Sequence, residues 1–379
     1  MTTHVLVTGG AGFIGSYIVD ALLAQGYEVR VLDNLTPQVH GPSGKRPAYL
    51  NPEAELVVGD VRDRSVIQRA LQGVTYVSHQ AAVVGVGQSM YQVAYYSDVN
   101  VMGTATLLDV LANEKHNVER LVVASSMSIY GEGAYICPIH GSQDVALRPL
   151  AQMREHDWEV HCPVCNRVLG AVPTGEAKPL RPTSVYAVGK RDQEEMCLAV
   201  GRAYNIPTIA LRYFNTYGPR QALSNPYTGA VAIFSSCLLN NQQPIIYEDG
   251  LQSRDFTHVT DIAQANVRAL EAKRVDFGAY NIGTGVRTSL LAMLETLRSV
   301  VGSDLQPSIQ QKFREGDIRH CFGDISAARA DLDFEPAITL EAGLRDLLPW
   351  LQSQNIQATR GDSLVEQAQA ELAAKGLTK

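Results

Sequence analysis

The sequence contains no uninterrupted apolar run near the roughly 18 residues that a membrane-spanning helix needs. Its first residues also lack the basic start and apolar stretch of a secretory signal peptide. Six cysteines among 379 residues are too few for a disulfide-dense scaffold. Acidic residues outnumber basic ones by 39 to 32, and a chain of net charge −7 is a poor candidate for non-specific nucleic-acid binding. These absences predict a cytoplasmic protein that binds neither membranes nor nucleic acids.

Strand and helix patterns alternate along the first part of the chain. Apolar residues at helical spacing separate several short, Val-rich runs, at 4–8, 28–33, 55–60, 74–82 and 118–126. Val-rich strands that alternate with helices are typical of a parallel sheet covered on both faces. The sequence therefore predicts an α/β fold with a doubly wound parallel sheet of the Rossmann type.

A glycine-rich turn joins the first predicted strand to the first predicted helix. Gly9, Gly12 and Gly15 stand in "TGGAGFIG", and Phe13 and Ile14 open the helix. Glycines at this spacing allow a tight turn and close approach to a pyrophosphate, and the helix N-terminus supplies free N–H groups. A glycine-rich turn without a ligand is the alternative, but the strand–turn–helix context favours a dinucleotide site.

Acidic residues end the next two predicted strands. Asp33, followed by Asn34, is placed to bind the adenosine ribose hydroxyls, which favours NAD over NADP, although Arg30 weakens that preference slightly. Asp60, followed by Val61, is a candidate for the adenine amino group. The alternative for Asp60 is a helix cap or a turn.

Candidate catalytic residues lie on the last predicted strand and on a later helix. Tyr186 and Lys190 stand four residues apart in "SVYAVGK", so both side chains share one helix face. A lysine beside a tyrosine favours the phenolate, and a nearby nicotinamide cation would act in the same direction, so we predict a lowered Tyr186 pKa and a general base. This spacing also occurs on exposed helix faces. Ser125 and Ser126 end a strand before the helix, where a hydroxyl projects into the ligand crevice.

Five motifs in order over about residues 3–350 resemble the extended short-chain dehydrogenases/reductases that act on nucleotide sugars. They are the glycine turn, the Ser-Ser strand end, Tyr-x-x-x-Lys, "LRYFNTYGPRQ" and "RDFTHVTDIA". The resemblance implies NAD as cofactor, a nucleotide-diphosphate sugar as substrate and a homodimer formed through helices of the NAD-binding domain. We expect an NAD-binding domain, a substrate-binding region and a polar C-terminal tail, at 1–215, 216–354 and 355–379.

The same resemblance implies roles for residues around the cofactor. Ala81 and Ala82 would line the cofactor, Asn100 would brace the catalytic strand, and Tyr213 would lie near the nicotinamide.

For the substrate, the resemblance implies four further residues. Asn215 would contact the diphosphate or sugar, Arg254 the diphosphate, and Arg314 and Asp317 the phosphates and the nucleoside ribose. Arginine forks suit phosphate geometry. For Arg314 the alternative is a surface ion pair.

The sequence departs from the sugar-nucleotide dehydratases directly after Ser126. Those enzymes carry an acidic pair there, whereas this chain has Met127 and Ser128. The region resembles the 4-epimerases, and among them most those of dTDP-L-rhamnose. The resemblance implies epimerisation at sugar C4 through a 4-keto intermediate. The alternatives are a dehydratase or reductase on the same scaffold, and a non-catalytic NAD-binding interaction protein.

An insert at 134–172 carries a second motif. Cys137 and His140 stand in "CPIH", and Cys162 and Cys165 in "CPVC". Three cysteines and one histidine in two short Cys-x-x-Cys-like turns are typical of a structural zinc site. The resemblance to sugar epimerases with this insert implies the same, because those proteins carry two Cys-x-x-Cys turns, and His140 would replace one of their cysteines. One alternative is a loop that binds no metal and keeps its thiols reduced, and the other is a redox-active cysteine pair.

Other side chains of the insert carry further expectations. His156 and His161 are rival zinc ligands, and Trp158 is expected to pack in the insert's own core. Because the insert connects the Ser126 strand to the Tyr186 helix, we expect it to cover the sugar or shape the pocket mouth.

Overall fold

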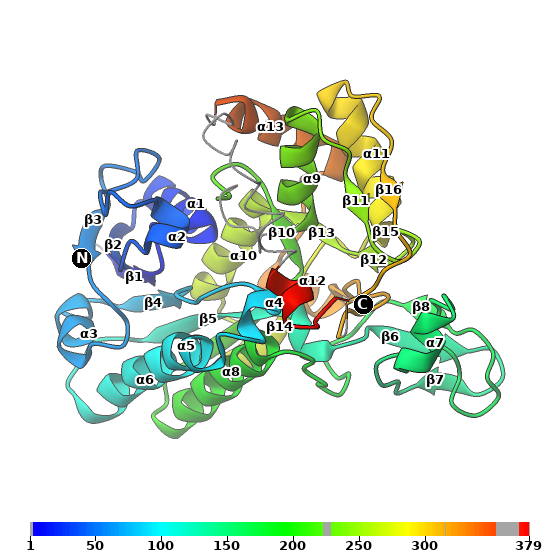
Figure 1. Cartoon of the computed structure of the whole chain (residues 1–379). Helices are drawn as coiled ribbons and strands as arrows, with labels where there is room; N and C mark the ends of the chain where they lie inside the picture. Colours follow the sequence, from blue (N-terminus) through cyan, green and yellow to red (C-terminus); the bar gives the residue numbers. More distant parts are fainter. Residues whose placement is uncertain (1–2, 223–228, 315, 354–370, 379) are drawn as a thin grey trace.

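The computed structural model describes residues 3–222, 229–314, 316–353 and 371–378. A seven-stranded sheet, in which every pair of neighbours is parallel, forms the centre of the molecule (Figure 1). In spatial order its strands are β3 (Glu55–Val58), β2 (Glu28–Asp33), β1 (His4–Thr8), β4 (Tyr76–His79), β5 (Arg120–Ser126), β9 (Thr208–Tyr213) and β14 (Phe277–Ile282).

Helices cover both faces of this sheet. On one face α1 (Phe13–Ala24), α10 (Val259–Glu271) and α12 (Ser326–Leu332) contribute to one apolar core. On the other face α3 (Arg64–Ala70), α6 (Gly103–Asn113) and α8 (Val185–Ala203) contribute to a second core. Because the central strands are buried on both sides, their Val-rich runs need no polar alternation. The predicted doubly wound α/β fold is confirmed.

Short helices surround the carboxyl edge of the sheet. They are α2 (Pro37–His40), α4 (Val86–Ser89), α5 (Val93–Tyr96), the π-helix η1 (Ser97–Met102) and the 3-10 helix η2 (Met127–Tyr130). The longer α8 begins at Ser184, whose side chain accepts a hydrogen bond from the Ala187 N–H at 3.1 Å. This cap sets the first turn of α8, which carries Tyr186.

A smaller lobe follows β9. It contains α9 (Ala230–Leu239), α11 (Leu290–Val301), α13 (Leu340–Ser353) and the paired strands β10 (Asn215–Tyr217) with β13 (Phe256–His258), β11 (Ile245–Ile246) with β16 (Ser308–Ile309), and β12 (Ser253–Arg254) with β15 (Thr288–Ser289). The three helices pack around a separate apolar core. Between residues 259 and 282 the chain returns to the main sheet through α10 and β14, so it crosses the expected division at residue 215 more than once.

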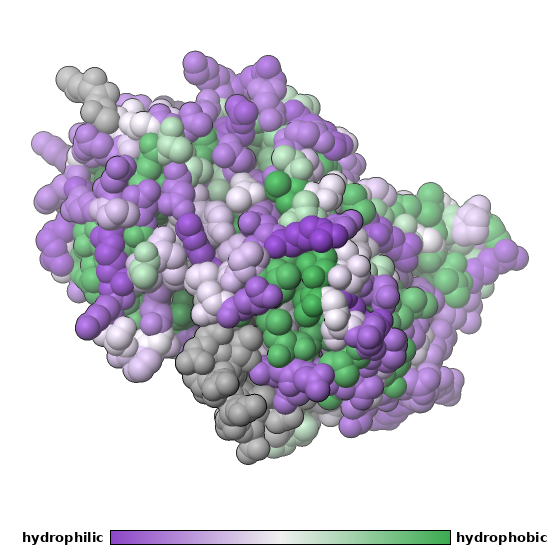
Figure 2. Space-filling model, turned by 90° about the horizontal axis from the view of Figure 1, so that it is seen from above, coloured by the Kyte–Doolittle hydropathy of each residue, from purple (hydrophilic) through white to green (hydrophobic). Residues whose placement is uncertain are grey.

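The insert forms its own small unit, which projects from one side of the molecule (Figures 1 and 2). Its strands β6 (Ala134–Cys137), β7 (Gly141–Gln143) and β8 (Gly170–Val172) form an antiparallel sheet, and α7 (Leu150–Arg154) lies beside them. Trp158 packs against Met153 and against Phe313 of the smaller lobe, with the two aromatic rings 6.2 Å apart. The expectation that Trp158 packs inside the insert holds in part, because this small cluster joins insert residues to Phe313, while a second cluster forms the rest of the insert's core.

Buried ion pairs fasten the insert to the smaller lobe. Arg148 donates to both carboxylate oxygens of Glu248 at 2.8 and 2.9 Å, and both side chains are at least 96% buried. Arg319, also fully buried, pairs with Glu159 of the insert at 2.6 Å. Removing one partner of the fully buried Arg148–Glu248 pair strands a buried charge, which costs about 3–5 kcal/mol. Glu159 is 33% exposed, and Arg319 also donates to Glu248 and Asp249, so this second pair contributes less. The insert is thus docked on the smaller lobe.

The end of the chain also packs on the body. Leu372 is 5% exposed and lies against Gly87 of α4, and Thr378 forms an antiparallel bridge with Arg314. The expected polar tail therefore ends, over residues 371–378, in a docked segment, whereas 354–370 lie outside the described residues. Among the described helices, none is both long and apolar enough to cross a membrane.

Candidate active site

A cavity of about 460 Å³ opens at the carboxyl ends of β1, β4 and β5. This is the point where strand order reverses on either side of β1, which is where doubly wound sheets bind ligands. Most residues predicted from the sequence line it: Gly9, Gly12, Phe13, Ile14, Gly15, Asp33, Asn34, Asp60, Val61, Ala81, Ala82, Ser125, Ser126, Tyr186, Lys190, Tyr213 and Asn215. Residues far apart in the sequence therefore meet around one space.

The glycine turn has the geometry of a phosphate cradle. A side chain on Gly15 would place its Cβ 2.2 Å from the Gly9 carbonyl oxygen, and Gly9 itself has φ +68° and lies against the Ala81 backbone. Gly12 caps α1 without any side-chain hydrogen bond. The first N–H groups of this helix are thus open to an anionic ligand. The cavity fits the pyrophosphate of a dinucleotide.

Carboxylates lie at the ends of β2 and β3. Asp33 accepts from the N–H groups of Ala11 at 3.1 Å and Leu35 at 2.9 Å, which holds its carboxylate at the cavity wall. The Asn34 amide donates to Asp60 at 3.1 Å. Hydrogen bonds from Arg62 lower the pKa of Asp60 to about 2, so Asp60 is a carboxylate at neutral pH.

Ser126 and Tyr186 face one another across the cavity end of β5. The Ser126 oxygen accepts from the Ser128 N–H at 3.2 Å and lies within hydrogen-bonding reach of the Tyr186 hydroxyl. Ser125 instead donates to Glu194 at 2.6 Å, and this carboxylate also accepts from Arg212. Ser126 is thus the serine directed at Tyr186 in the cavity, and Ser125 anchors β5 to α8.

Burial shifts the pKa values of both members of the Tyr-Lys pair. Burial raises the pKa of Tyr186 to about 12, and the hydrogen bond with Ser126 offsets only part of this rise. Burial also lowers the pKa of Lys190 to about 8, and its ammonium donates to the Ala124 carbonyl at 3.0 Å. In the protein without a cofactor, the cost of burying a phenolate is thus the larger effect on the Tyr186 pKa. The lowered pKa expected from Lys190 and a nicotinamide cation together stays a prediction.

The polar groups of Asn100 and Tyr213, two residues expected at the cofactor, form hydrogen bonds with other segments of the protein. Asn100 does not brace the catalytic strand, since its amide accepts from the Val83 N–H at 2.7 Å and donates to the Val83 carbonyl at 3.1 Å. It holds the segment after β4 and does not line the cavity. The Tyr213 hydroxyl donates to Gln80 at 3.0 Å and accepts from Asn266 at 2.7 Å, and burial raises its pKa.

The predicted substrate residues separate into two groups. Asn215 lines the cavity, and its buried Oδ1 has no hydrogen-bond partner among the described residues. Arg254, Arg314 and Asp317 do not line it. Arg254 donates to three main-chain carbonyls of the smaller lobe, and the Arg314 guanidinium stacks 4.7 Å from the Tyr247 ring centre.

Sequence patterns missed two stretches of the cavity wall. One is the turn after Asp33, which contributes Thr36, Gln38, Val39 and His40, and the other is Val83–Val86 after β4. Neither carries a motif, and the only signal was position after a strand at the ligand-binding edge. None of the insert's residues lines the cavity. The expectation that the insert covers the sugar or shapes the pocket mouth stays a prediction.

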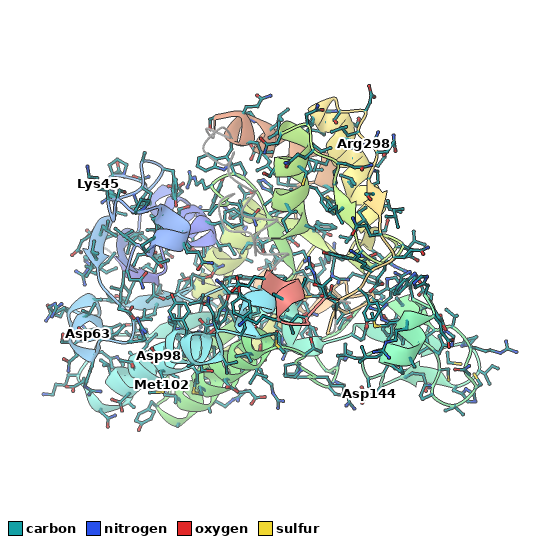
Figure 3. All side chains as sticks on the ribbon, in the orientation of Figure 1. Lys45, Asp63, Asp98, Met102, Asp144 and Arg298 are labelled. Atoms are coloured by element: carbon teal, nitrogen blue, oxygen red, sulfur yellow. The ribbon has the colours of Figure 1, made fainter. Side chains whose placement is uncertain are left out.

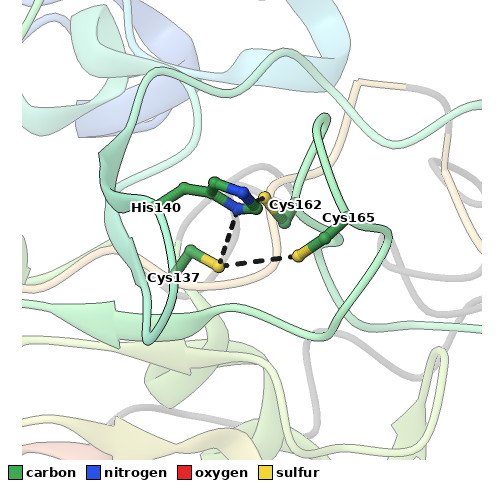
Figure 4. Close-up of side chains that lie close together, drawn as sticks. All are labelled: Cys137, His140, Cys162 and Cys165. Atoms are coloured by element: carbon green, nitrogen blue, oxygen red, sulfur yellow. Dashed lines mark hydrogen bonds between the residues drawn. The ribbon is translucent and has the colours of Figure 1, made fainter.

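The insert's four predicted ligands converge at one point (Figure 4). The ligand atoms of Cys137, His140, Cys162 and Cys165 all lie within 4.8 Å of one another. The Cys137 sulfur is 3.7 Å from that of Cys165, and the His140 Nδ1 is 3.6 and 3.5 Å from the sulfurs of Cys137 and Cys162. The rival ligands lie elsewhere: His161 bonds to Asp157 and Asn166, and His156 stacks on Trp158.

Comparison with known proteins agrees with this geometry. The chain matches the NAD dependent epimerase/dehydratase family over residues 5–158 and 164–283. It is 36% identical to dTDP-L-rhamnose 4-epimerase of Burkholderia thailandensis, over 92% of this chain and 95% of that protein.

Solved structures give the same result. UDP-glucose 4-epimerase of Thermotoga maritima with UDP-glucose superposes with a TM-score of 0.74 at 30% identity, covering 92% of this chain and 99% of that chain. The NAD complex of UDP-glucose 4-epimerase from Thermus thermophilus superposes with a TM-score of 0.72 at 30% identity, covering 93% and 100%. The chain therefore belongs to the NAD dependent epimerase/dehydratase family of extended short-chain dehydrogenases/reductases, among the NAD-dependent nucleotide-sugar 4-epimerases.

Proposed function

We propose that this protein inverts the configuration at sugar C4 of a dTDP-linked 6-deoxyhexose, such as dTDP-L-rhamnose, through a 4-keto intermediate. The observation that carries the proposal is the convergence of Ser126, Tyr186 and Lys190 beside a dinucleotide cradle in one cavity. The similarity to dTDP-L-rhamnose 4-epimerase supports the choice of sugar.

The cofactor is NAD, held by the glycine turn, the open N-terminus of α1 and Asp33. Bound NAD supplies the hydride acceptor for C4 and a cationic ring that favours the Tyr186 phenolate. Tyr186 takes the proton of the C4 hydroxyl and later returns it, while Ser126 holds the same oxygen by a hydrogen bond. The Lys190 ammonium keeps its hydrogen bond to the Ala124 carbonyl during these steps. Since the sugar is oxidised and then reduced, there is no net redox change.

We propose that the apolar part of the cavity wall accommodates a deoxygenated C6. Val84, Val86, Met127 and Phe214 line the cavity with apolar side chains. A methyl group gains about 0.8 kcal/mol when it is buried in such surroundings, whereas a hydroxyl without a partner loses free energy. This lining supports a 6-deoxyhexose over glucose.

A substrate panel tests the proposal. The purified protein is incubated with dTDP-L-rhamnose, dTDP-glucose and UDP-glucose, and the C4 epimers are separated by chromatography and identified by NMR. We expect conversion of the dTDP-6-deoxyhexose at the highest kcat/KM, without net absorbance change at 340 nm. Conversion of none of these sugars would contradict the proposal.

Three other functions would give distinct results in the same assay. A dehydratase would release water and lower the product mass, but Met127 and Ser128 offer no acid and base for that step. A reductase would change the absorbance at 340 nm. A non-catalytic NAD-binding protein would bind NAD and give no product, and the site formed by Ser126, Tyr186 and Lys190 argues against it.

The insert binds a structural zinc ion through Cys137, His140, Cys162 and Cys165. Thiolate and imidazole ligands at 2.0–2.3 Å from a tetrahedral ion lie roughly 3.4–3.8 Å apart, which agrees with the three distances of 3.5, 3.6 and 3.7 Å. Four protein ligands leave no open position on zinc, so its role is structural.

Two copies of the chain form a homodimer through the outer faces of α5, η1 and α8. Apolar side chains are exposed there, including Val93, Met102 and Val188 at 48%, 55% and 45%. Figure 3 shows Met102 at the outer side of the helices that cover the sheet. Light scattering of Met102→Glu should show a monomer where the unchanged chain is a dimer, and an identical mass for both would contradict this assembly.

A further inference from the structure

A row of buried polar side chains crosses the main sheet directly beside Ser126. Ser125, Arg212 and Asn281 are register partners on the neighbouring strands β5, β9 and β14. All three residues are buried, so their polar groups need hydrogen-bond partners inside the protein. The proposed mechanism assigns no part in the reaction to any of them.

Arg212 is the centre of this row. Its guanidinium donates to both carboxylate oxygens of Glu194 in α8, at 2.6 and 3.0 Å, and to the Tyr130 hydroxyl at 2.8 Å. The guanidinium carbon also lies 5.0 Å from the centre of the Tyr130 ring. Because the guanidinium is a rigid fork of donors, it fixes the relative position of the two groups that it holds. Arg212 therefore connects α8 to the end of η2.

The partners of this guanidinium hold both ends of the segment that carries Ser126. At the first end, the Ser125 hydroxyl donates to Glu194 at 2.6 Å. At the other end, the Tyr130 hydroxyl donates to Asn281 at 2.7 Å. Ser126 thus lies on a short segment whose two ends are bonded to buried groups. We call the residues of this arrangement the Arg212 network: Ser125, Tyr130, Glu194, Arg212 and Asn281.

Helix α8 carries the other catalytic residues together with one member of the network. Tyr186, Lys190 and Glu194 are spaced four residues apart and share one face of the helix. The Lys190 ammonium donates to the Ala124 carbonyl, which belongs to the peptide bond with Ser125. A shift of this peptide along α8 would displace the lysine's acceptor and the neighbouring catalytic serine together. The network therefore sets the position of β5 relative to the helix.

We propose that the Arg212 network is a positioning device, which holds Ser126 against Tyr186 so that both hydroxyls reach the same oxygen of the sugar. The inference rests on the proposed function and deepens it. Proton transfer requires hydrogen-bonding distance, and a displacement of about 1 Å can cost up to 10²-fold in rate. Tyr130 is fully buried and does not line the cavity, so it acts on the reaction through position alone.

Two variants each release one end of the segment and leave the buried Arg212–Glu194 pair intact. Ser125→Ala removes the donor to Glu194, and Tyr130→Phe removes the hydroxyl but keeps the ring against Arg212. In full-length protein, kcat per NAD-loaded chain, KM for the best sugar of the substrate panel and Kd for NAD are measured. We expect each variant to lower kcat about tenfold, with KM and Kd within twofold of the unchanged chain.

Matched controls make the same chemical changes elsewhere. Ser142→Ala, exposed on β7, and Tyr204→Phe, exposed at the end of α8, should keep the kcat of the unchanged chain.

The NAD-loaded fraction separates positioning from stability, because chains that fail to fold do not enter the calculation of kcat. A kcat within twofold of the unchanged chain for either variant, or a loss confined to KM or to NAD binding, would overturn this inference alone. Conversion of no sugar by the unchanged chain would overturn the proposed function together with it.

Discussion

The Tyr186 hydroxyl has to lose a proton in surroundings that disfavour the phenolate. Burial raises its pKa to about 12 in the protein itself, and the Ser126 hydroxyl offsets only part of this. Lys190 is occupied by the Ala124 carbonyl at 3.0 Å. Deprotonation of Tyr186 therefore depends on the positive charge of bound NAD as well as on the protein. Without NAD, Tyr186 should remain protonated and unreactive.

Tyr186→Phe should reduce kcat by about 10³-fold, because it removes the group that accepts and returns the proton. NAD affinity should change little, since most of the cradle is backbone. Steady-state assays and NAD titration measure the two quantities. Tyr204→Phe, exposed at the end of the same helix, is the control.

The rate of the unchanged enzyme should fall as the pH falls, because the acceptor has to be deprotonated, and Tyr186→Phe should lack this dependence.

At the scale of elements, the insert is attached to the smaller lobe and stays outside the cavity. Arg148–Glu248 and Arg319–Glu159 are buried contacts between the two parts. The insert's own core is small, with six buried residues, of which Cys137 and Cys162 are two. A unit of this size depends on additional cross-links, which a metal provides.

Chelation or Cys162→Ser should therefore release about one zinc ion per chain and lower the Tm of the protein. Elemental analysis and calorimetry measure these changes, and Cys237→Ser, outside the cluster, is the control. Because the insert holds the smaller lobe, KM for the nucleotide sugar should rise more than Kd for NAD. A purified protein that contains no zinc and loses no stability with chelator would contradict the zinc site.

At the scale of the whole molecule, the chain end joins two parts of the active-site region. Leu372 packs against α4, beside the cavity residue Val86, and Thr378 pairs with Arg314 of the smaller lobe. The Tyr91 hydroxyl also donates to Glu371 at 3.0 Å. The segment 371–378 therefore ties the smaller lobe to the cofactor domain.

Leu372→Asp, or a chain ending at residue 370, should raise KM for the nucleotide sugar about tenfold, because burial of a leucine contributes about 1.5–3 kcal/mol. NAD content should change less than KM, since the glycine turn that forms the cradle belongs to the junction of β1 and α1. Ala373→Ser, at an exposed neighbouring position, is the control. An unchanged KM in both altered chains would show that this contact does not support substrate binding.

The sequence alone determined those features that depend on neighbours along the chain. Glycines at a strand–helix junction, two side chains four residues apart on a helix and paired knuckles are local patterns, and each was found where it was predicted. Only the tertiary structure decided how distant segments pair. It placed His40 beside Asp33, the Asn100 amide on Val83 and the insert on the smaller lobe. The physical reason is that these contacts depend on side-chain packing and desolvation between segments, which no local spacing encodes.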